Sequence, residues 1–568
     1  MFGCRVNGLH IDICTQACHR CHQLPNKPTR WFIRRSAYLK HILLLSILAI
    51  THWDRMEVTL SSNSANEPAI HRLVDDILAY IFFLNATPLD PDSEDPPTIE
   101  HATTVASSQV CTRWRSIALD CHTIWSLIID YHRHPLKWIE TLLDRSNPSL
   151  LDFGGRSKIV RLRDLVDGGQ GVLELVLNHV DRLRIFNLHV PICTWELVSL
   201  RFLQMSAPNL EFMNILLGGT AGHLTHPLFN NHAPNLQSLG LVRCTVDFTS
   251  PIFTPLTELS VDLSEKNSRP TILDWLNILG GMLSLRSVRL GHAISSGSES
   301  PNVVFPVIHL DDLDMLSLNG PLHECVILVK HLIVRPCCGL TLLCDHVQLG
   351  FDQRQLWAII EKKINSWAKN APYRRLNAVA SAVFVSIGNL PREGDGWESK
   401  EVDPAITISL GLLYSQEAVP LFHSLFALFE RSFLYTTSLQ LWISHDPAGA
   451  EVFLPLVDNF RGFVNLEKLM VGNDSLPKLL FPLLQHANSV LLPAIKSLFF
   501  FDVTFQDGSD SILPLADFLR WRKERGFPVQ KIKIDSDPRR INRRYVLSHI
   551  QDTVVEMDDS DTEGEDNN

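Results

Sequence analysis

Long apolar runs are missing from this sequence of 568 residues. The run His41–Ile50 follows several basic residues, as a membrane anchor would, but it is far shorter than the roughly 20 residues that a membrane-spanning helix needs. About 40 residues precede it, and the following Thr51, His52 and Trp53 make a poor signal-peptide cleavage site. We therefore expect an amphipathic segment or a translation start at Met56, with a membrane anchor as the alternative.

Dense cysteine frameworks are missing as well. Twelve cysteines are scattered over the whole chain, unlike the closely spaced pairs of a small secreted domain, so we expect free thiols in a reducing compartment. Zinc sites need well-defined pairs of ligands, and neither cysteine–histidine group has a second pair at a suitable distance. These groups are Cys14, Cys18, Cys21 and His22, and Cys337, Cys338, Cys344 and His346. We expect no metal and no cofactor, with zinc as the alternative.

Catalytic signatures are the third absence. The sequence has no G-x-S-x-G, no H-E-x-x-H, no P-loop and no G-x-G-x-x-G after a strand, which argues against an enzyme. The net charge is −11, but the segment from Asp552 to the end holds eight acidic residues and no basic one, so the remainder carries about −3. That balance gives no general attraction to nucleic acid or to a membrane. We expect a protein of the cytoplasm, the nucleus or both.

A repeating leucine pattern is what the sequence does contain. The segment Leu236–Cys244 fits L-x-x-L-x-L-x-x-C, the core of a leucine-rich repeat. The tetrapeptide Ala-Pro-Asn-Leu occurs at Ala207–Leu210 and at Ala233–Leu236, which indicates a unit of about 26 residues. Weaker copies are Leu183/Phe186/Leu188, Leu256/Leu259/Val261, Leu285/Val288/Leu290, Leu313/Leu316/Leu318, Leu466/Leu469/Val471 and Ile495/Leu498/Phe500/Val503.

Each copy predicts a short strand, because alternate residues of x-L-x-L face one side. One such unit cannot bury its own apolar face, so the units must stack on one another. We therefore expect an α/β protein whose residues 155–535 form an irregular leucine-rich-repeat solenoid, with short parallel strands alternating with helices. Residues 335–435 show little of the pattern and include the amphipathic helix Gln353–Lys369, so we expect an interruption there.

Residues 66–130 predict a helical module in front of the solenoid. Its first helix carries Asp75 and Asp76 in the first turn, where the helix dipole favours them. A loop with four prolines and four acidic residues, 87–97, separates this helix from a second one at Thr104–Leu119 and a third at Cys121–Leu127. Three helices this short cannot bury all of their apolar side chains against each other, so some must face another body or a partner.

The apolar residues of this module carry a family resemblance. They run Leu73-x-x-Asp76-Ile77-Leu78-x-x-Ile81-Phe82, then Val110-Cys111-x-x-Trp114-Arg115-x-Ile117-Ala118, then Ile124-Trp125-x-x-Ile128. This order resembles an F-box, and more closely the F-box-like modules of mushroom-forming fungi, which leucine-rich repeats often follow. A connecting helix and strand at 131–153 resemble the segment after the box in those proteins. Val74 departs from the proline that the family usually has, and the acidic loop is long for the family.

The resemblance implies a substrate-recognition adaptor of a cullin–RING (SCF-type) ubiquitin ligase. The box would dock on a Skp-type adaptor, and the repeats would hold an unknown protein substrate. The implied docking residues are Leu73, Ile77, Leu78, Ile81, Phe82, Val110, Trp114 and Trp125; the alternative is that they form the module's own core. A different class of function is a leucine-rich-repeat scaffold for protein interactions with a non-functional F-box-like cap.

The two ends of the chain show no such pattern. Residues 1–65 lack clear periodicity, and we expect them to be poorly structured. The basic stretch Arg520–Arg544 predicts a last helix, a strand at Val529–Ile534 and a solvated linker; nucleic-acid binding is its alternative interpretation. We expect residues 536–568 to form a basic, then acidic, disordered tail.

Overall fold

The structure is a computed structural model that describes residues 73–557 with gaps, of which the longest are 88–97, 195–203, 390–405 and 444–458. It divides into two compact units, Met1–Asn178 and His179–Asn568. The first unit therefore extends beyond the boundary near residue 155 that the sequence predicts. One reason is that helix α7 (Gln170–Leu177) packs against α6 (Leu136–Arg145): a Cβ at Gly171 would lie 3.2 Å from the Leu136 side chain.

Helices dominate the first unit. In chain order they are α2 (Asp75–Ala86), α3 (Thr98–Ser107), α4 (Thr112–Asp120), α5 (His122–Leu127), α6 and α7, with the short strands β1 (Leu151–Phe153) and β2 (Val160–Arg161) between the last two. The third helix, predicted at Cys121–Leu127, and the connecting helix, predicted at Leu136–Arg145, are confirmed to within one residue, and the predicted first helix corresponds to α2. The acidic loop 88–97 and residues 1–72 lie outside the described residues.

The predicted second helix, Thr104–Leu119, is wrong because the chain breaks between α3 and α4. Cys111 is extended there, with φ −156° and ψ 172°, and its Sγ accepts a hydrogen bond from the backbone N–H of Trp114 at 3.5 Å. Ser108 donates its hydroxyl to the carbonyl of Val105 at 2.7 Å. Side chains that bond to nearby backbone groups in this way favour helix ends over helix interiors.

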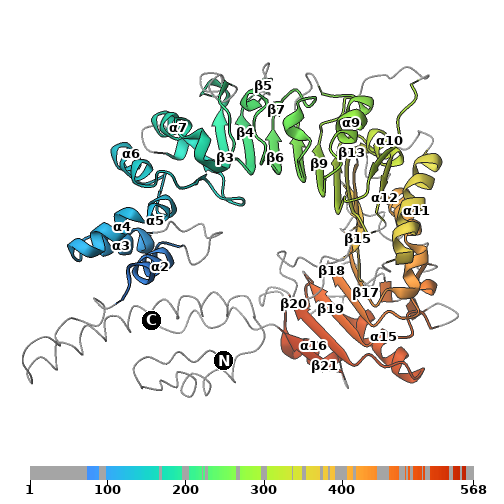
Figure 1. Ribbon diagram of the computed structural model, residues 1–568. Coiled ribbons are helices and arrows are strands. Elements are labelled where there is room, and N and C mark those ends of the chain that lie inside the picture. The colour runs from blue at the N-terminus through green and yellow to red at the C-terminus, as the bar shows by residue number, and fades with distance from the viewer. Residues whose placement is uncertain are drawn as a thin grey trace, which may run out of the picture. The chain divides into compact units, whose positions relative to one another are not determined.

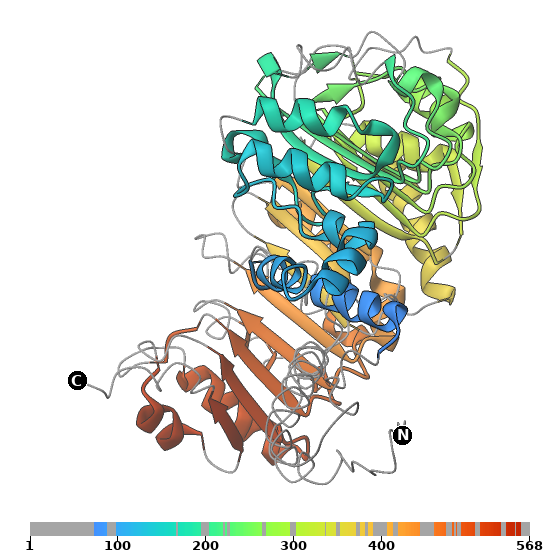
Figure 2. The ribbon, with the colours of Figure 1, turned by 60° about the vertical axis from the view of Figure 1, so that its left-hand side comes forward.

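A long, mostly parallel sheet forms the second unit (Figures 1 and 2). Each strand of its first part pairs in parallel with the next strand of the series, without a crossover. The series is β3 (Leu183–Pro191), β4 (Phe212–Gly218), β6 (Ser238–Val242), β8 (Glu258–Asp262), β9 (Ser287–Gly291), β11 (Met315–Asn319) and β13 (Gly339–Val347).

The strand order changes after β13, in the region where the leucine pattern fades. Strand β13 pairs in parallel with β16 (Ile406–Leu412), and β15 (Phe384–Asn389) lies antiparallel between β16 and β14 (Arg375–Ala380). Strand β14 then pairs in parallel with β17 (Ser438–Ile443). The expected interruption is therefore a local reversal of strand order, and the sheet itself continues through it.

The parallel order resumes at β17 and extends to β18 (Lys468–Gly472), β19 (Ser497–Phe501), β20 (Lys531–Asp535) and β21 (Val554–Met557). The strand predicted at Val529–Ile534 corresponds to β20. The expectation of a disordered tail from residue 536 is wrong up to Met557, because helix α16 (Arg543–His549) and β21 lie in that range. Backbone pairing of β21 with β20 holds this segment on the sheet.

The core lies on one face of this sheet. The register aligns the repeated leucines, with Leu239 opposite Leu259 and Leu241 opposite Val261, and all four are at most 1% exposed. Figure 1 shows helices along the outer side of the sheet. They include α9 (Ile272–Gly280), α10 (Leu322–His331), α11 (Gln353–Asn370), α12 (Ala418–Leu428) and α15 (Ile512–Glu524). Helix α11 confirms the helix predicted at Gln353–Lys369.

Smaller elements complete the unit. Two strand pairs stand apart from the long sheet, β5 (Gly222–His223) with β7 (Cys244–Thr245) and β10 (Ile308–Leu310) with β12 (Leu332–Val334). Single turns of 3-10 helix occur at Val180–Arg182, Leu228–Asn231, Pro251–Phe253 and Phe460–Gly462, with a longer one at Glu430–Tyr435; a further turn, Leu162–Asp164, belongs to the first unit. Within the described part of the chain, no helix combines the length and the apolarity that a membrane crossing requires.

Candidate protein-binding surfaces

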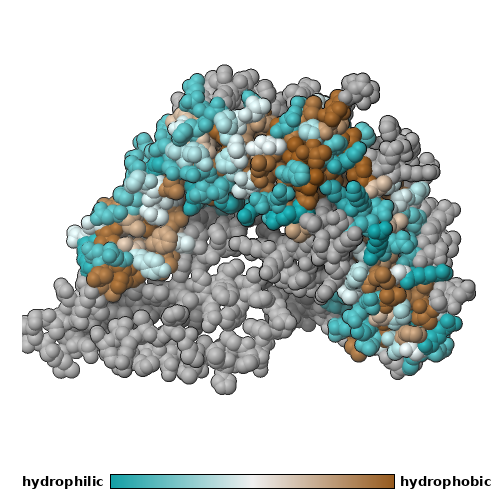
Figure 3. Space-filling model, turned by 45° about the vertical axis from the view of Figure 1, so that its right-hand side comes forward, coloured by the Kyte–Doolittle hydropathy of each residue, from teal (hydrophilic) through white to brown (hydrophobic). Residues whose placement is uncertain are grey.

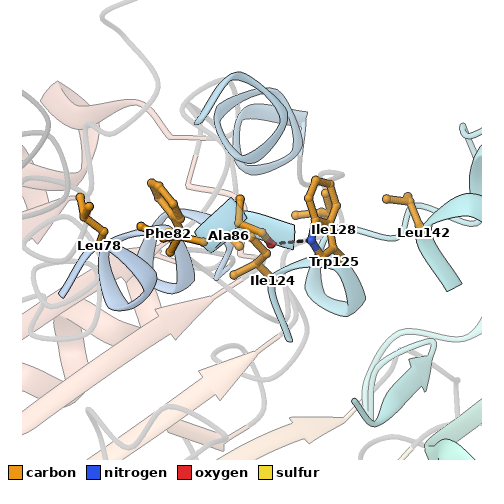
Figure 4. Packing of buried hydrophobic residues seen from close by; sticks show 9 residues of the cluster. Leu78, Phe82, Ala86, Ile124, Trp125, Ile128 and Leu142 are labelled. Carbon is orange, nitrogen blue, oxygen red and sulfur yellow. Dashed lines mark hydrogen bonds between the residues drawn. The ribbon is translucent and has the colours of Figure 1, made fainter. Parts of the chain in front are cut away.

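The helical module closes around its own core of apolar side chains (Figure 4). Trp125 is fully buried at the centre, where its indole N–H donates to the carbonyl of Ala118 at 2.7 Å. The guanidinium of Arg145 lies 4.7 Å from the Trp125 ring centre, which adds a cation–π contact from α6. Phe82 is 1% exposed and packs against the Trp114 ring, with 5.2 Å between the ring centres.

Three of the eight predicted docking residues, Leu78, Phe82 and Trp125, therefore belong to this core, and Ile81 is buried outside this cluster. Leu78, Ile81, Phe82 and Trp125 are at most 9% exposed. Their side chains stabilise the module and offer no surface to a partner. The physical reason is that α3, α4 and α5 all pack against α2.

The other four predicted residues are accessible to different degrees. Ile77 is 47% exposed and Val110 is 61% exposed, whereas Leu73 and Trp114 are half-buried at the margin of the core. Of the eight predicted docking residues, the accessible ones are therefore Leu73, Ile77, Val110 and Trp114.

An apolar stripe runs along the uncovered side of α2. It consists of Ile77, Tyr80 and Leu84, at spacings of three and four residues, which place side chains on one helical face, whereas Leu73 precedes the helix and packs against the core. Tyr80 is 61% exposed, and Val74 beside the stripe is 59% exposed. Figure 3 shows hydrophobic residues gathered on the helical module. Sequence reasoning missed Tyr80 because apolar residues occur on every side of α2, so periodicity alone does not reveal the outward face.

Arg113 holds the start of α2, one turn before this stripe. Its Nε donates to the Asp75 carboxylate at 3.0 Å, and one of its terminal nitrogens contacts both that carboxylate and the carbonyl of Leu73. Val74, between these two residues, precedes the first helical residue with φ −69° and ψ 154°. A charged side chain from α4 therefore holds the first turn of α2 in place.

Two histidines near α6 form a pH-sensitive contact in the first unit. The rings of His101 and His134 lie 4.5 Å apart, and the indole N–H of Trp138 donates to His101 Nε2 at 3.2 Å. That nitrogen must be unprotonated to accept. Burial lowers the pKa of His101, and burial together with the neighbouring His101 lowers the pKa of His134. At neutral pH both rings are therefore uncharged.

A second candidate surface is the face of the long sheet opposite its core. One row of aligned residues crosses the strands from β3 to β17, and its members are small or polar and uncharged, except for one arginine. The row is Asn187, Asn214, Gly240, Ser260, Arg289, Ser317, Thr341, Thr407, Gly388, Asn377 and Gln440. Within it, Asn214 donates to the Asn187 side chain at 2.9 Å and lies over Gly240, where a Cβ would collide with it.

Metal ligands are not grouped on either surface. Among the described residues, no three or more His, Cys, Asp or Glu side chains are placed to hold a metal ion. Of the second predicted group, Cys338 and Cys344 are buried and Cys337 is exposed. Burial raises the pKa of the Cys338 thiol to about 12. The N-terminal group of Cys14, Cys18, Cys21 and His22 lies outside the described residues.

No protein-family model matches this chain, and no curated protein matches it either.

Proposed function

We propose that this chain is a substrate-recognition adaptor of a cullin–RING ubiquitin ligase. In this proposal the helical module is an F-box that docks on a Skp-type adaptor, and the second unit is an irregular leucine-rich-repeat solenoid that binds a protein substrate. The chain would contribute no chemistry of its own. It would raise the effective concentration of substrate lysines near the ubiquitin-conjugating enzyme.

The observation that carries the proposal is the apolar stripe on a module whose core is already closed. Exposed apolar residues that follow one helical face are typical of helix-in-groove recognition. Val110 is a further exposed apolar residue of the module, three positions before the Arg113 that contacts the start of α2. The F-box resemblance and this surface involve the same segment of the chain, so they support one partner class.

The sheet supports the second half of the proposal. Its strands carry the L-x-x-L-x-L residues in parallel register, as stacked repeats require. On the opposite face, one aligned row across many consecutive strands consists of small and polar residues. Such a face suits an extended protein segment, because each strand adds one position of contact.

The test measures binding of the full chain to a purified Skp-type adaptor by biolayer interferometry. The variant Ile77→Glu/Tyr80→Glu places two charges on the stripe. Burial of a large apolar side chain contributes about 1.5–3 kcal/mol. Losing two such contacts should weaken binding by roughly 3 kcal/mol, or about a hundredfold in Kd.

The matched control is Leu283→Glu/Val304→Glu, two exposed apolar residues of the second unit at 64% and 88% exposure. The control should bind like the unmodified chain. If the folded, unmodified chain does not bind the adaptor, the ligase proposal fails and a repeat scaffold with an F-box-like cap remains. If the stripe variant and the control bind equally, docking does not use α2.

A further inference from the structure

The C-terminal strands of the sheet differ from the rest on the face opposite the core. Their inward residues, such as Leu441, Val471, Phe500 and Ile534, are fully buried. On the other face, the polar row that crosses β3 to β17 continues into Met470, Phe499 and Lys533. The next row along the strands aligns Trp442, Gly472, Phe501 and Asp535. The aromatic–lysine face consists of Trp442, Lys468, Met470, Phe499, Phe501 and Lys533.

Gly472 lets the aromatic side chains of this face close together. A Cβ at residue 472 would collide with both the Phe501 and the Trp442 rings, so these rings cover the glycine from the two neighbouring strands. The ring centres of Phe499 and Phe501 lie 6.4 Å apart. All three aromatic side chains remain half-buried. They therefore form one continuous, partly accessible apolar area.

Positive charge flanks this area on both sides. The ammonium groups of Lys468 on β18 and Lys533 on β20 lie 5.6 Å and 5.4 Å from the centre of the Phe499 ring on β19. Lys531 also lies on β20 and pairs with Glu556 at 2.7 Å. Two acidic residues share this face: Asp535 is aligned with Phe501, and Glu556 is aligned with Lys533. The three lysines outnumber these two carboxylates, so the face carries a small net positive charge that attracts an anionic segment.

We propose that the acidic segment Asp558–Asp566 of this same chain binds the aromatic–lysine face. The segment has six acidic residues and no basic one. It comes directly after β21, two strands away from the strand that carries Phe499. Neighbouring strands are about 4.8 Å apart, so the segment must cross only about 10 Å, and nine extended residues reach about 30 Å.

Covalent attachment makes this contact intramolecular. A short tether gives an effective concentration in the millimolar range, so even a weak contact is mostly formed. The contact goes beyond the proposed ligase function and does not depend on it, because it involves neither α2 nor an adaptor. Its consequence is competition: an acidic segment of another protein would have to displace the chain's own tail from this face.

The experiment uses a fluorescent peptide with the sequence of residues 556–568 and measures its anisotropy with two full-length chains. One chain is unmodified, and the other carries Asn or Gln at all six acidic tail positions. We expect the neutral-tail chain to bind the peptide and the unmodified chain to bind it at least tenfold more weakly. Because exposed charges are screened by salt, binding should weaken as the salt is raised from about 50 mM to 500 mM.

Variants of the neutral-tail chain locate the contact. Lys468→Ala/Lys533→Ala should lose at least tenfold in peptide affinity. The matched control, Lys330→Ala/Lys523→Ala, removes two exposed lysines from helices α10 and α15 and should bind normally. A neutral-tail chain that binds no peptide overturns the proposal. Equal binding by the neutral-tail and unmodified chains also overturns it, and would show a face open to acidic segments of other proteins. Neither result bears on the proposed adaptor binding, which is tested separately with the α2 variants.

Discussion

Val74→Pro should stabilise the helical module. The substitution introduces the proline that the F-box pattern usually has at this position and that this chain lacks. Val74 has φ −69°, within the −65 ± 15° that a proline ring imposes. Its side chain is 59% exposed, so replacing it removes little packing. Its carbonyl accepts from the N–H groups of Ile77 and Leu78, and proline keeps that carbonyl. In the described residues the Val74 N–H donates no backbone hydrogen bond that proline would remove.

The magnitude of this effect comes from the unfolded chain. A proline at a position whose native backbone already suits it restricts the unfolded state and stabilises by about 0.4–1 kcal/mol. For a unit of this size, that corresponds to a rise in Tm of roughly 1–4 °C. Arg113 already holds Leu73 and Asp75 on either side of residue 74, so we expect the lower half of this range.

The assay is thermal unfolding of the full chain followed by calorimetry, with the transition of the first unit compared between variants. The control is Val105→Pro, inside α3, which should destabilise by about 3 kcal/mol because it breaks a helix interior. A lower Tm for Val74→Pro would refute the reasoning. It would mean that the start of α2 needs a backbone geometry or a hydrogen bond that proline does not allow.

Three further outcomes test other parts of the structure. Phe82→Ala should destabilise the first unit by roughly 3–5 kcal/mol, whereas Ile77→Ala should cost less than about 1 kcal/mol in the same denaturant titration; similar losses would contradict the division into core and stripe. The lowered pKa of His101 means that the unfolded state binds more protons, so stability should be complete above about pH 6.5 and fall as the pH drops below it. His101→Gln keeps an acceptor for Trp138 and should flatten the fall between about pH 6.5 and 5; an unchanged pH profile would exclude His101 as its source. Arg522→Lys should lower the stability of the second unit by roughly 2–5 kcal/mol, although the charge is retained. Arg522 is fully buried, and its planar guanidinium donates to several carbonyls, among them that of Leu491 at 3.1 Å. An unchanged Tm would refute this role.

The leucine pattern predicts the strands that carry it, because each repeat encodes its own strand; they are β3, β6, β8, β9, β11, β18 and β19. Leu239 and Leu241 alternate with Ser238, Gly240 and Val242, and the same leucine spacing returns in β8, β9, β11, β18 and β19. A parallel neighbour with the same spacing then completes the core. The order of β14, β15 and β16 could not be predicted in this way. It depends on pairing between distant segments, such as β13 with β16, and no local pattern encodes which segments pair.

The break between α3 and α4 shows a different limit of periodicity. Val110, Trp114 and Ile117 are spaced as one helical face would be, and this spacing predicts a continuous helix. The structure ends the first helix before Val110 because Ser108 and Cys111 bond to the backbone around them. Cysteine is not among the preferred N-cap residues, so the residue type at this position does not indicate that a helix starts there.

Only half of the predicted docking residues are accessible, for a related reason. Helix α2 has apolar residues all around, and the packing of α3, α4 and α5 decides which of them face outward. Phe82 and Ile77 are therefore equivalent in the sequence and opposite in the structure. This division has a consequence for any adaptor test. A change at Phe82 would lower adaptor binding by unfolding the module, whereas changes at Ile77 and Tyr80 leave the core intact. Only the latter can separate the loss of a docking surface from the loss of the fold.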